Sequence, residues 1–172
     1  PLRSKSDAVA RANKVMLYKT AKYSLEAPLL IGAALGGAHE SELRSLSNFG
    51  IPLGLAFQLR DDILGVFGDP QVTGKPAGDD LREGKRTALI AFASQTAEWS
   101  SISQLVGDSE LSAEDAATVR EVLERTGAKK FTQRLASDYA DEAVAALHGA
   151  GIPQQLIEQL TPLVTAVVER VR

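Results

Sequence analysis

The sequence contains no cysteine, and this absence excludes disulfide bonds and thiolate metal sites. A chain without disulfides suits a reducing compartment, so we expect a cytoplasmic protein. Long hydrophobic runs are also missing. The longest apolar stretch, residues 27–38, is interrupted by one proline and three glycines. It is too short to cross a bilayer as a helix, and we expect no transmembrane segment.

The chain also lacks an excess of positive charge. It has 19 basic and 22 acidic side chains, which are well mixed along the sequence and give a formal net charge of −3. Proteins that bind nucleic acid usually carry a basic patch or stripe. We therefore expect no nucleic-acid partner.

What the chain does have is enough apolar material for one globular domain, with 172 residues and 44% hydrophobic side chains. It begins with Pro1 rather than with methionine. We therefore expect it to be a portion of a longer polypeptide.

Apolar residues recur at spacings of three and four, which predicts an all-α bundle. We expect Pro28 to mark a helix boundary, and Pro52 and Gly54 to break or soften a long helix. The expected helices are about 5–27, an apolar one to residue 35, 40–67, about 86–100, 112 to just before 127, 129–148 and 153–172.

Between Gly68 and Gly84 the composition changes to glycine, proline, aspartate and lysine. Such a segment is long for a connection inside a compact domain, and we expect it to contain no regular element. It is either a functional loop or an ordinary mobile surface loop.

The strongest chemical signal is the run Phe57-Gln58-Leu59-Arg60-Asp61-Asp62, which is followed by Asp69 and several spaced lysines. Carboxylate oxygens are the ligands that Mg²⁺ prefers, and lysine ammonium groups neutralise phosphate charge. Two adjacent acids alone are typical of a solvated helix face. Combined with the lysines, they indicate a site for a magnesium-bridged diphosphate.

Residues four apart lie on one face of a helix. Phe57 is therefore expected to align with Asp61, and Gln58 with Asp62, at the polar mouth of a cavity. Apolar neighbours on the same helix would serve core packing or contact a hydrocarbon ligand.

Several motifs, in this order and at this spacing, make the chain resemble the C-terminal half of the trans-type isoprenyl diphosphate synthases, or polyprenyl synthetases. The resemblance covers about residues 5–93 by motif and the rest by helical character. The motifs are Lys19-Thr20, Phe57-Gln58-x-x-Asp61-Asp62, Gly74-Lys75, Gly78-Asp79-Asp80-Leu81 and Gly84-Lys85-x-Thr87.

The resemblance implies an all-α prenyltransferase that joins an allylic diphosphate to isopentenyl diphosphate with Mg²⁺ as cofactor, and it implies a homodimer. By this comparison Asp61 and Asp62 hold the metal, and Lys19, Lys75 and Lys85 contact the allylic diphosphate. Thr20 and Gln58 match residues beside the reacting carbon. Phe57 and Asp80 match supporting residues, with Asp80 near the metal's waters or a neighbouring lysine.

The sequence departs from the family pattern at two places. Many members carry a third acid four residues after the first, where this chain has Gly65, so we expect fewer side chains on the metal or help from Asp69. The first acidic motif and the basic isopentenyl-binding sequence do not occur. We therefore expect residues 1–172 to be the C-terminal portion of a single polyprenyl synthetase domain whose N-terminal half lies outside this chain, and product length is left open.

Two other functions fit part of the pattern. A terpene cyclase shares the magnesium and diphosphate chemistry, but its second metal motif expects a hydroxyl where this chain has Gly65. A non-catalytic subunit of a prenyl synthase would also lack the first acidic motif. It would be expected to have lost some of the lysines and acids that are intact here, so an incomplete enzyme is the preferred interpretation.

Overall fold

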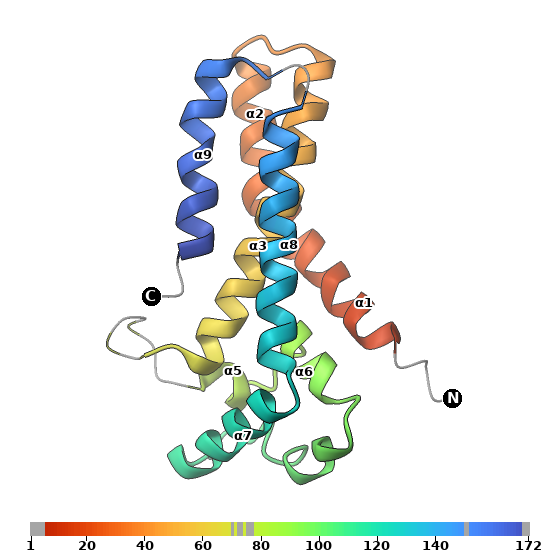
Figure 1. Ribbon diagram of the computed structural model, residues 1–172, viewed down its shortest axis with the longest axis vertical. Coiled ribbons are helices and arrows are strands. Elements are labelled where there is room, and N and C mark those ends of the chain that lie inside the picture. The colour runs from red at the N-terminus through yellow and green to blue at the C-terminus, as the bar shows by residue number, and fades with distance from the viewer. Residues whose placement is uncertain (1–5, 70, 72–73, 75–77, 150–151, 170–172) are drawn as a thin grey trace. The chain divides into compact units, whose positions relative to one another are not determined.

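A computed structural model describes residues 6–69, 71, 74, 78–149 and 152–169. These residues form helices and turns without a strand, which confirms the predicted all-α class. In chain order the helices are α1 (Ser6–Met16), the π-helix η1 (Leu17–Glu26), α2 (Ala27–Leu35), α3 (Glu40–Phe67), α5 (Asp79–Arg82), α6 (Ala88–Ala93), the 3₁₀-helix η2 (Ala97–Ser101), α7 (Ala113–Arg125), α8 (Ala128–Leu147) and α9 (Gln154–Glu169), as Figure 1 shows.

The chain divides into two compact units, which we describe separately. Unit 1 contains the segment up to Asn13 and residues 61–134, and unit 2 contains residues 14–60 and the segment from Leu135 onward. Helix α3 contributes to both, because the division falls between Arg60 and Asp61.

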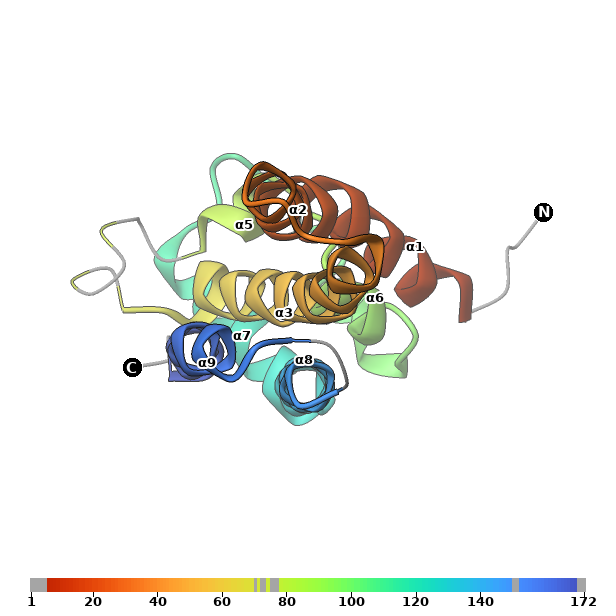
Figure 2. The ribbon, with the colours of Figure 1, turned by 90° about the horizontal axis from the view of Figure 1, so that it is seen from above.

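In unit 2, α3 lies between α2 on one side and α8 and α9 on the other (Figure 2). Its buried side chains Leu46, Phe49 and Leu53 pack with residues of α8 and α9 such as Leu147 and Leu160. On the other side of α3, partly buried leucines of η1 and α2 join the same cluster. α3 is therefore the central helix of this unit.

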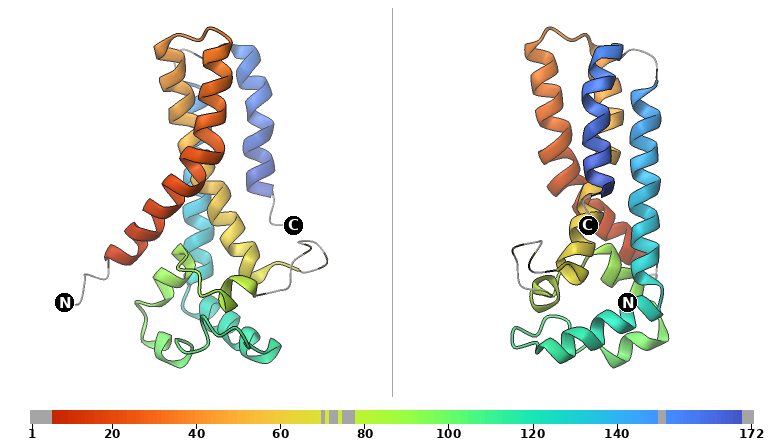
Figure 3. Two further views of the ribbon diagram at one scale, coloured as in Figure 1. Left: turned by 180° about the vertical axis from the view of Figure 1, so that it is seen from behind. Right: turned by 60° about the vertical axis from the view of Figure 1, so that its left-hand side comes forward.

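In unit 1, the end of α3, the short helices and the first turns of α8 gather around a second core (Figure 3). Val66 of α3 packs there with Leu81, Leu89 and Leu123. The ammonium group of Lys129 lies 4.2 Å from the centre of the Phe67 ring, a cation–π contact that ties the last residue of α3 to the first turn of α8.

Several predicted helix ends are confirmed. α2 ends at Gly36-Gly37, where Gly37 has φ of +82°, and glycine adopts this left-handed conformation at little cost. Ser112 caps α7, because its Oγ accepts a hydrogen bond from the Asp115 amide at 3.0 Å. Gly127, with φ of +80°, separates α7 from α8.

Other predictions are wrong. Pro52 and Gly54 do not break α3, because buried residues on either side of the proline hold the helix in place. The first predicted helix ends at Glu26, as expected, but from Leu17 onward it has π-helical geometry. The segment 68–84 contains the one-turn helix α5, and the helix expected over 86–100 is divided into α6 and η2.

None of the helices in the described ranges is long and apolar enough to cross a membrane, as predicted. In α2 all nine residues remain at least partly accessible to solvent although the helix is strongly apolar.

Candidate functional site

The predicted pair Thr20 and Gln58 is brought together in unit 2. Thr20 is buried on η1, and its hydroxyl donates a hydrogen bond to Gln58 Oε1 at 2.5 Å. The two residues are 38 positions apart in sequence, and the contact joins η1 directly to α3. The hydroxyl has one proton, which it donates to Gln58. Thr20 Oγ1 can therefore accept a hydrogen bond from a further group, or direct its lone pairs toward a positive charge, but it cannot donate a second hydrogen bond.

Two other predicted residues neighbour this pair in sequence. Lys19 precedes Thr20 on the π-helix, and it is exposed to solvent. Phe57 precedes Gln58 on α3 and is partly buried against the core of unit 2. The observed role of Phe57 is therefore packing behind the pair.

The acidic pair lies near the end of α3, as predicted, and belongs to unit 1. Its two members differ in exposure, because adjacent residues on a helix point about 100° apart. Asp61 is half-buried, whereas Asp62 has 5% exposure. Asp61 is therefore the more accessible carboxylate.

Small and polar residues of α3 share a face within each unit. In unit 2, Gly54 and Gln58 are four residues apart on this helix, and in unit 1 Asp61 and Gly65 are also four residues apart.

The Asp80 side chain lies against Gly65 of α3. A Cβ atom built on Gly65 would overlap the Asp80 carboxylate, so the carboxylate of α5 lies directly against the backbone of α3. The same carboxylate is paired with the Lys85 ammonium group. The lysine that neighbours Asp80 is thus Lys85, and Gly65 provides the space for the Asp80 carboxylate.

The turn that carries Lys85 is fixed by backbone contacts. Gly84 has φ of +62°, and a Cβ on it would come within 3.0 Å of the Gly107 Cα. The Gly107 amide donates to the Leu81 carbonyl at 2.7 Å, and the Lys85 amide donates to the Asp80 carbonyl at 3.0 Å.

The hydrogen bond to Asp80 raises the pKa of Lys85; burial opposes this effect, and Glu83 adds to it. Lys85 is therefore a stable cation beside the end of α3.

Of the two remaining predicted residues, one lies just after α3 and the other lies outside the described ranges. Asp69 follows the end of α3 and is exposed, and its Oδ1 accepts a hydrogen bond from the Gln71 amide at 2.9 Å. This turn-forming contact is its observed role. Lys75 lies outside the residues that the structure describes.

Over the described ranges, no group of three histidine, cysteine, aspartate or glutamate side chains is arranged to hold a metal ion. Magnesium does not require such a group, because it usually binds through one or two carboxylates and completes its shell with water and substrate phosphate oxygens. Of the pair, Asp61 has the accessible carboxylate that such binding needs, whereas Asp62 is buried.

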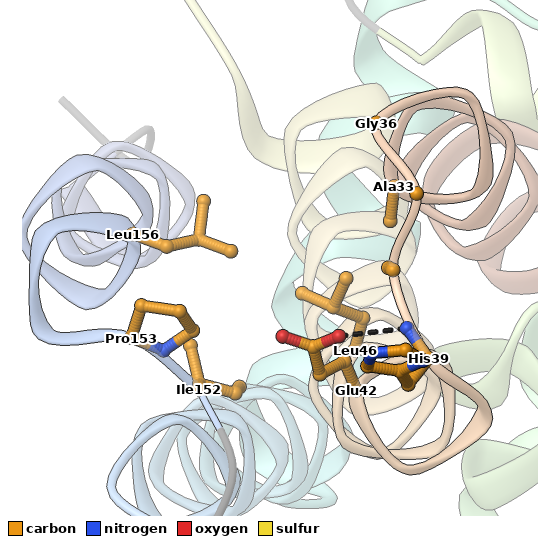
Figure 4. A pocket seen from close by; sticks show the side chains of 10 residues that line it. Ala33, Gly36, His39, Glu42, Leu46, Ile152, Pro153 and Leu156 are labelled. Carbon is orange, nitrogen blue, oxygen red and sulfur yellow. Dashed lines mark hydrogen bonds between the residues drawn. The ribbon is translucent and has the colours of Figure 1, made fainter.

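A pocket of about 420 Å³ lies elsewhere in unit 2, between the start of α3 and the start of α9 (Figure 4). Leu46, Ile152 and Leu156 form its apolar walls, and Glu42 accepts a hydrogen bond from the His39 amide at its rim. None of the predicted site residues lines this pocket.

Sequence reasoning missed Glu26, a buried carboxylate at the end of η1. Its oxygens accept hydrogen bonds from the Ser47 hydroxyl of α3 and from the Lys22 ammonium group. Burial raises the pKa of Glu26, but the bonds from Ser47 and Lys22 outweigh it, so the pKa lies below its ordinary value. The contact ties η1 to α3.

We expect Glu26→Gln to make the free energy of unfolding less dependent on pH in the acidic range. A carboxylate with a lowered pKa contributes stability that is present above its unfolded pKa and is lost as the pH falls through its folded pKa. Urea unfolding between pH 7 and pH 3 measures this loss, and the effect at pH 7 should be about 1 kcal/mol. Ser47→Ala should weaken the same pH dependence, and an unchanged slope in both variants would contradict the assignment.

Sequence reasoning also missed the roles of Gly54 and Gly65. Glycine inside a helix costs about 1 kcal/mol relative to alanine, so a buried glycine in a helix signals a close contact. That signal was available from the sequence, but the partner of each glycine was not.

The chain matches the family model described as polyprenyl synthetase over residues 3–125. It is 36% identical to a geranylfarnesyl diphosphate synthase of Aeropyrum pernix over 149 residues, which cover 86% of this chain and 46% of that protein. It is 31% identical to a (2E,6E)-farnesyl diphosphate synthase of Mycobacterium bovis, with 81% and 41% covered.

Solved structures agree with these matches. A geranylgeranyl pyrophosphate synthase from Corynebacterium glutamicum, described as complexed with isoprenyl diphosphate and magnesium, superposes with a TM-score of 0.88 at 40% identity. The match covers 94% of this chain and 47% of that structure. The chain thus spans about half the length of these relatives, and it belongs to the polyprenyl synthetase family.

Proposed function

We propose that this chain is part of a Mg²⁺-dependent trans-prenyltransferase that condenses an allylic diphosphate with isopentenyl diphosphate. The observation that carries the proposal is the hydrogen bond from Thr20 to Gln58 in unit 2, which joins the Lys19-Thr20 motif of η1 to the Phe57-Gln58 motif of α3. The relatives named above are synthases of this type. The motifs of the chain correspond to the C-terminal portion of the family's domain, so the first acidic motif is expected in the other half.

The proposed diphosphate site combines negative and positive side chains. Asp61 and Asp62 would hold Mg²⁺, and Lys19, Lys75 and Lys85 would contact the phosphate oxygens. When bound, Mg²⁺ stabilises the negative charge that develops on the departing diphosphate. Lys85 suits its role because its ammonium group is held in place beside α3 by the ion pair with Asp80.

Thr20 and Gln58 would act on the other half of the ionising bond. Loss of diphosphate leaves an allylic cation, which fixed oxygen dipoles stabilise without reorganisation. The Thr20 hydroxyl donates its proton to Gln58, so its own lone pairs can point toward positive charge. Apolar residues of α3 exclude water from the cation. The double bond of isopentenyl diphosphate then attacks, and loss of a proton completes the new chain.

The test is to incubate the full-length protein with Mg²⁺, labelled isopentenyl diphosphate and an allylic diphosphate, and to size the lipids formed. We expect a longer polyprenyl diphosphate that depends on both substrates and disappears with EDTA. Product formed from the allylic substrate alone would instead identify a cyclase. No product alone, but product after mixing with a second subunit, would identify the non-catalytic alternative.

The homodimer stays a prediction. On η1 and α2, the large side chains of Tyr18, Tyr23 and Ile31 are exposed. Apolar side chains exposed on one segment favour contact with another surface.

A further inference from the structure

The contact between η1 and α3 depends on a glycine. Gly54 is buried in the middle of α3. A Cβ atom at this position would lie 2.5 Å from the Cα of Ala21 and 2.9 Å from its Cβ. Carbon atoms in ordinary contact are about 3.5–4 Å apart. The backbone of η1 therefore rests directly on the backbone of α3, at a distance that only glycine permits.

This close contact adjoins the Thr20–Gln58 hydrogen bond on both helices. Thr20 precedes Ala21 on η1, and Gln58 lies one turn after Gly54 on α3. Alanine at position 54 would require the helices to separate by about 1 Å. Because the hydroxyl-to-amide distance is 2.5 Å and hydrogen bonds of this type extend to about 3.0 Å, such a separation would weaken or break the bond.

η1 and α3 make a second contact about two turns before Gly54 on α3. Glu26 of η1 is bonded to Ser47, and a Cβ on Gly50 would lie 3.3 Å from the Glu26 Cα. With this end of η1 held, a displacement at Gly54 is expected to open the interface toward Thr20 rather than to shift the whole helix.

We infer that Gly54 is a positioning residue: it sets the distance between Thr20 and Gln58 through the backbone of Ala21 and does not itself touch substrate. The inference rests on the proposed function for its effect on turnover, but the positioning itself can be measured without any reaction.

The first experiment is a double-mutant cycle on unfolding of the full-length protein, with Thr20→Val and Gln58→Leu as the two changes. With glycine at position 54, we expect the effects of the two substitutions on the unfolding equilibrium constant to differ from independence by about fivefold, which is the usual contribution of one such hydrogen bond. In the Gly54→Ala background we expect the coupling to disappear. A coupling that persists at full size would overturn the inference, whether or not the protein turns over substrate.

The matched control is Gly32→Ala, an exposed glycine inside α2 whose added Cβ would meet nothing within 4 Å. It should leave the coupling intact. A second control is Ala21→Gly in the Gly54→Ala background. Because the nearest atom is the Cα of Ala21 rather than its Cβ, removing the methyl group should not restore the coupling, and full restoration would contradict a backbone contact.

If Gly54→Ala fails to fold, Gly50→Ala provides the smaller perturbation. Its Cβ would meet Cδ1 at the end of the Leu29 side chain at 3.1 Å and the Glu26 Cα at 3.3 Å, so the two helices should separate less and the coupling should fall without vanishing. An unchanged coupling in a folded Gly50→Ala protein would overturn the inference.

The kinetic readout follows from the same geometry. A displacement of about 1 Å in a positioned group can reduce the rate by about 100-fold, so Gly54→Ala should lower kcat by about 10- to 100-fold. The KM for the allylic diphosphate should change less than kcat, because Lys19 is the one side chain of those proposed to bind it that lies on the displaced helix. A raised KM with an unchanged kcat would contradict the assignment.

Discussion

Replacing Asp61 with alanine is expected to reduce prenyl transfer at least about 100-fold while leaving the helical content intact. Asp61 lies half-buried near the end of α3, where its carboxylate can reach a ligand. Without it, the charge on a departing diphosphate would lose the cation that offsets it. Steady-state turnover as a function of Mg²⁺ concentration, with far-ultraviolet circular dichroism, measures both effects.

Asp62 provides an internal comparison, because its side chain has 5% exposure. We expect Asp62→Asn to lower turnover and also to lower the free energy of unfolding, because a buried group would lose part of its bonding. Asp138, an exposed acid on α8, is the charge-matched control, and Asp138→Ala should change neither quantity. Normal turnover in both Asp61→Ala and Asp62→Asn would remove the metal assignment.

The second large effect is expected for Gly65→Ala, which should displace Asp80 from α3 and separate it from Lys85. The added Cβ would overlap the Asp80 carboxylate, and overpacking of this kind usually costs about 1–3 kcal/mol. The raised pKa of Lys85 should then return toward its ordinary value, because its first cause is the bond to Asp80. Nuclear magnetic resonance titration of the Lys85 side chain measures this change directly.

A double variant separates the steric effect from the electrostatic one. Adding Asp80→Ala to Gly65→Ala removes the overlapping carboxylate, so the free energy of unfolding should recover. The pKa of Lys85 should stay near its ordinary value, because the bond to Asp80 is gone. The two substitutions should therefore be strongly non-additive in free energy of unfolding. Simple additivity, or an unchanged Lys85 pKa in Gly65→Ala, would show that Gly65 does not provide the space for Asp80.

The regular parts of the fold could be predicted because they are encoded locally. The bounds of α3, the Ser112 cap of α7 and the turn at Gly36-Gly37 each follow from residues within a few positions of one another. The spacing of apolar residues also identified the all-α class. These features do not depend on which segments meet in space.

The errors arose where distant contacts override local preference. Pro52 was expected to interrupt α3, but burial on both sides stabilises the continuous helix. α5 was missed because a segment rich in glycine and aspartate favours turns, although Leu81 is anchored in the core of unit 1. The π-helical turns of η1 differ too little from α-helical spacing to be read from apolar periodicity.

The candidate site shows the same division. The sequence identified Thr20, Gln58, Asp61, Asp62, Asp80 and Lys85 by motif, and the structure shows two contacts among them, Thr20 with Gln58 and Asp80 with Lys85. The sequence alone could not identify which residues hold these pairs in place. Gly54 meets a residue 33 positions away, and Gly65 meets one 15 positions away, so their partners are set by tertiary packing.

The backbone contact between Gly84 and Gly107 has a practical consequence for protein engineering. Since the amide of Gly107 bonds to Leu81 beside the turn that carries Lys85, the connection between α6 and α7 is also a support for that lysine. A combinatorial library that diversifies residues 94–111 should recover functional clones chiefly among those that retain glycine at position 107, even though this position is remote in sequence from every acidic motif.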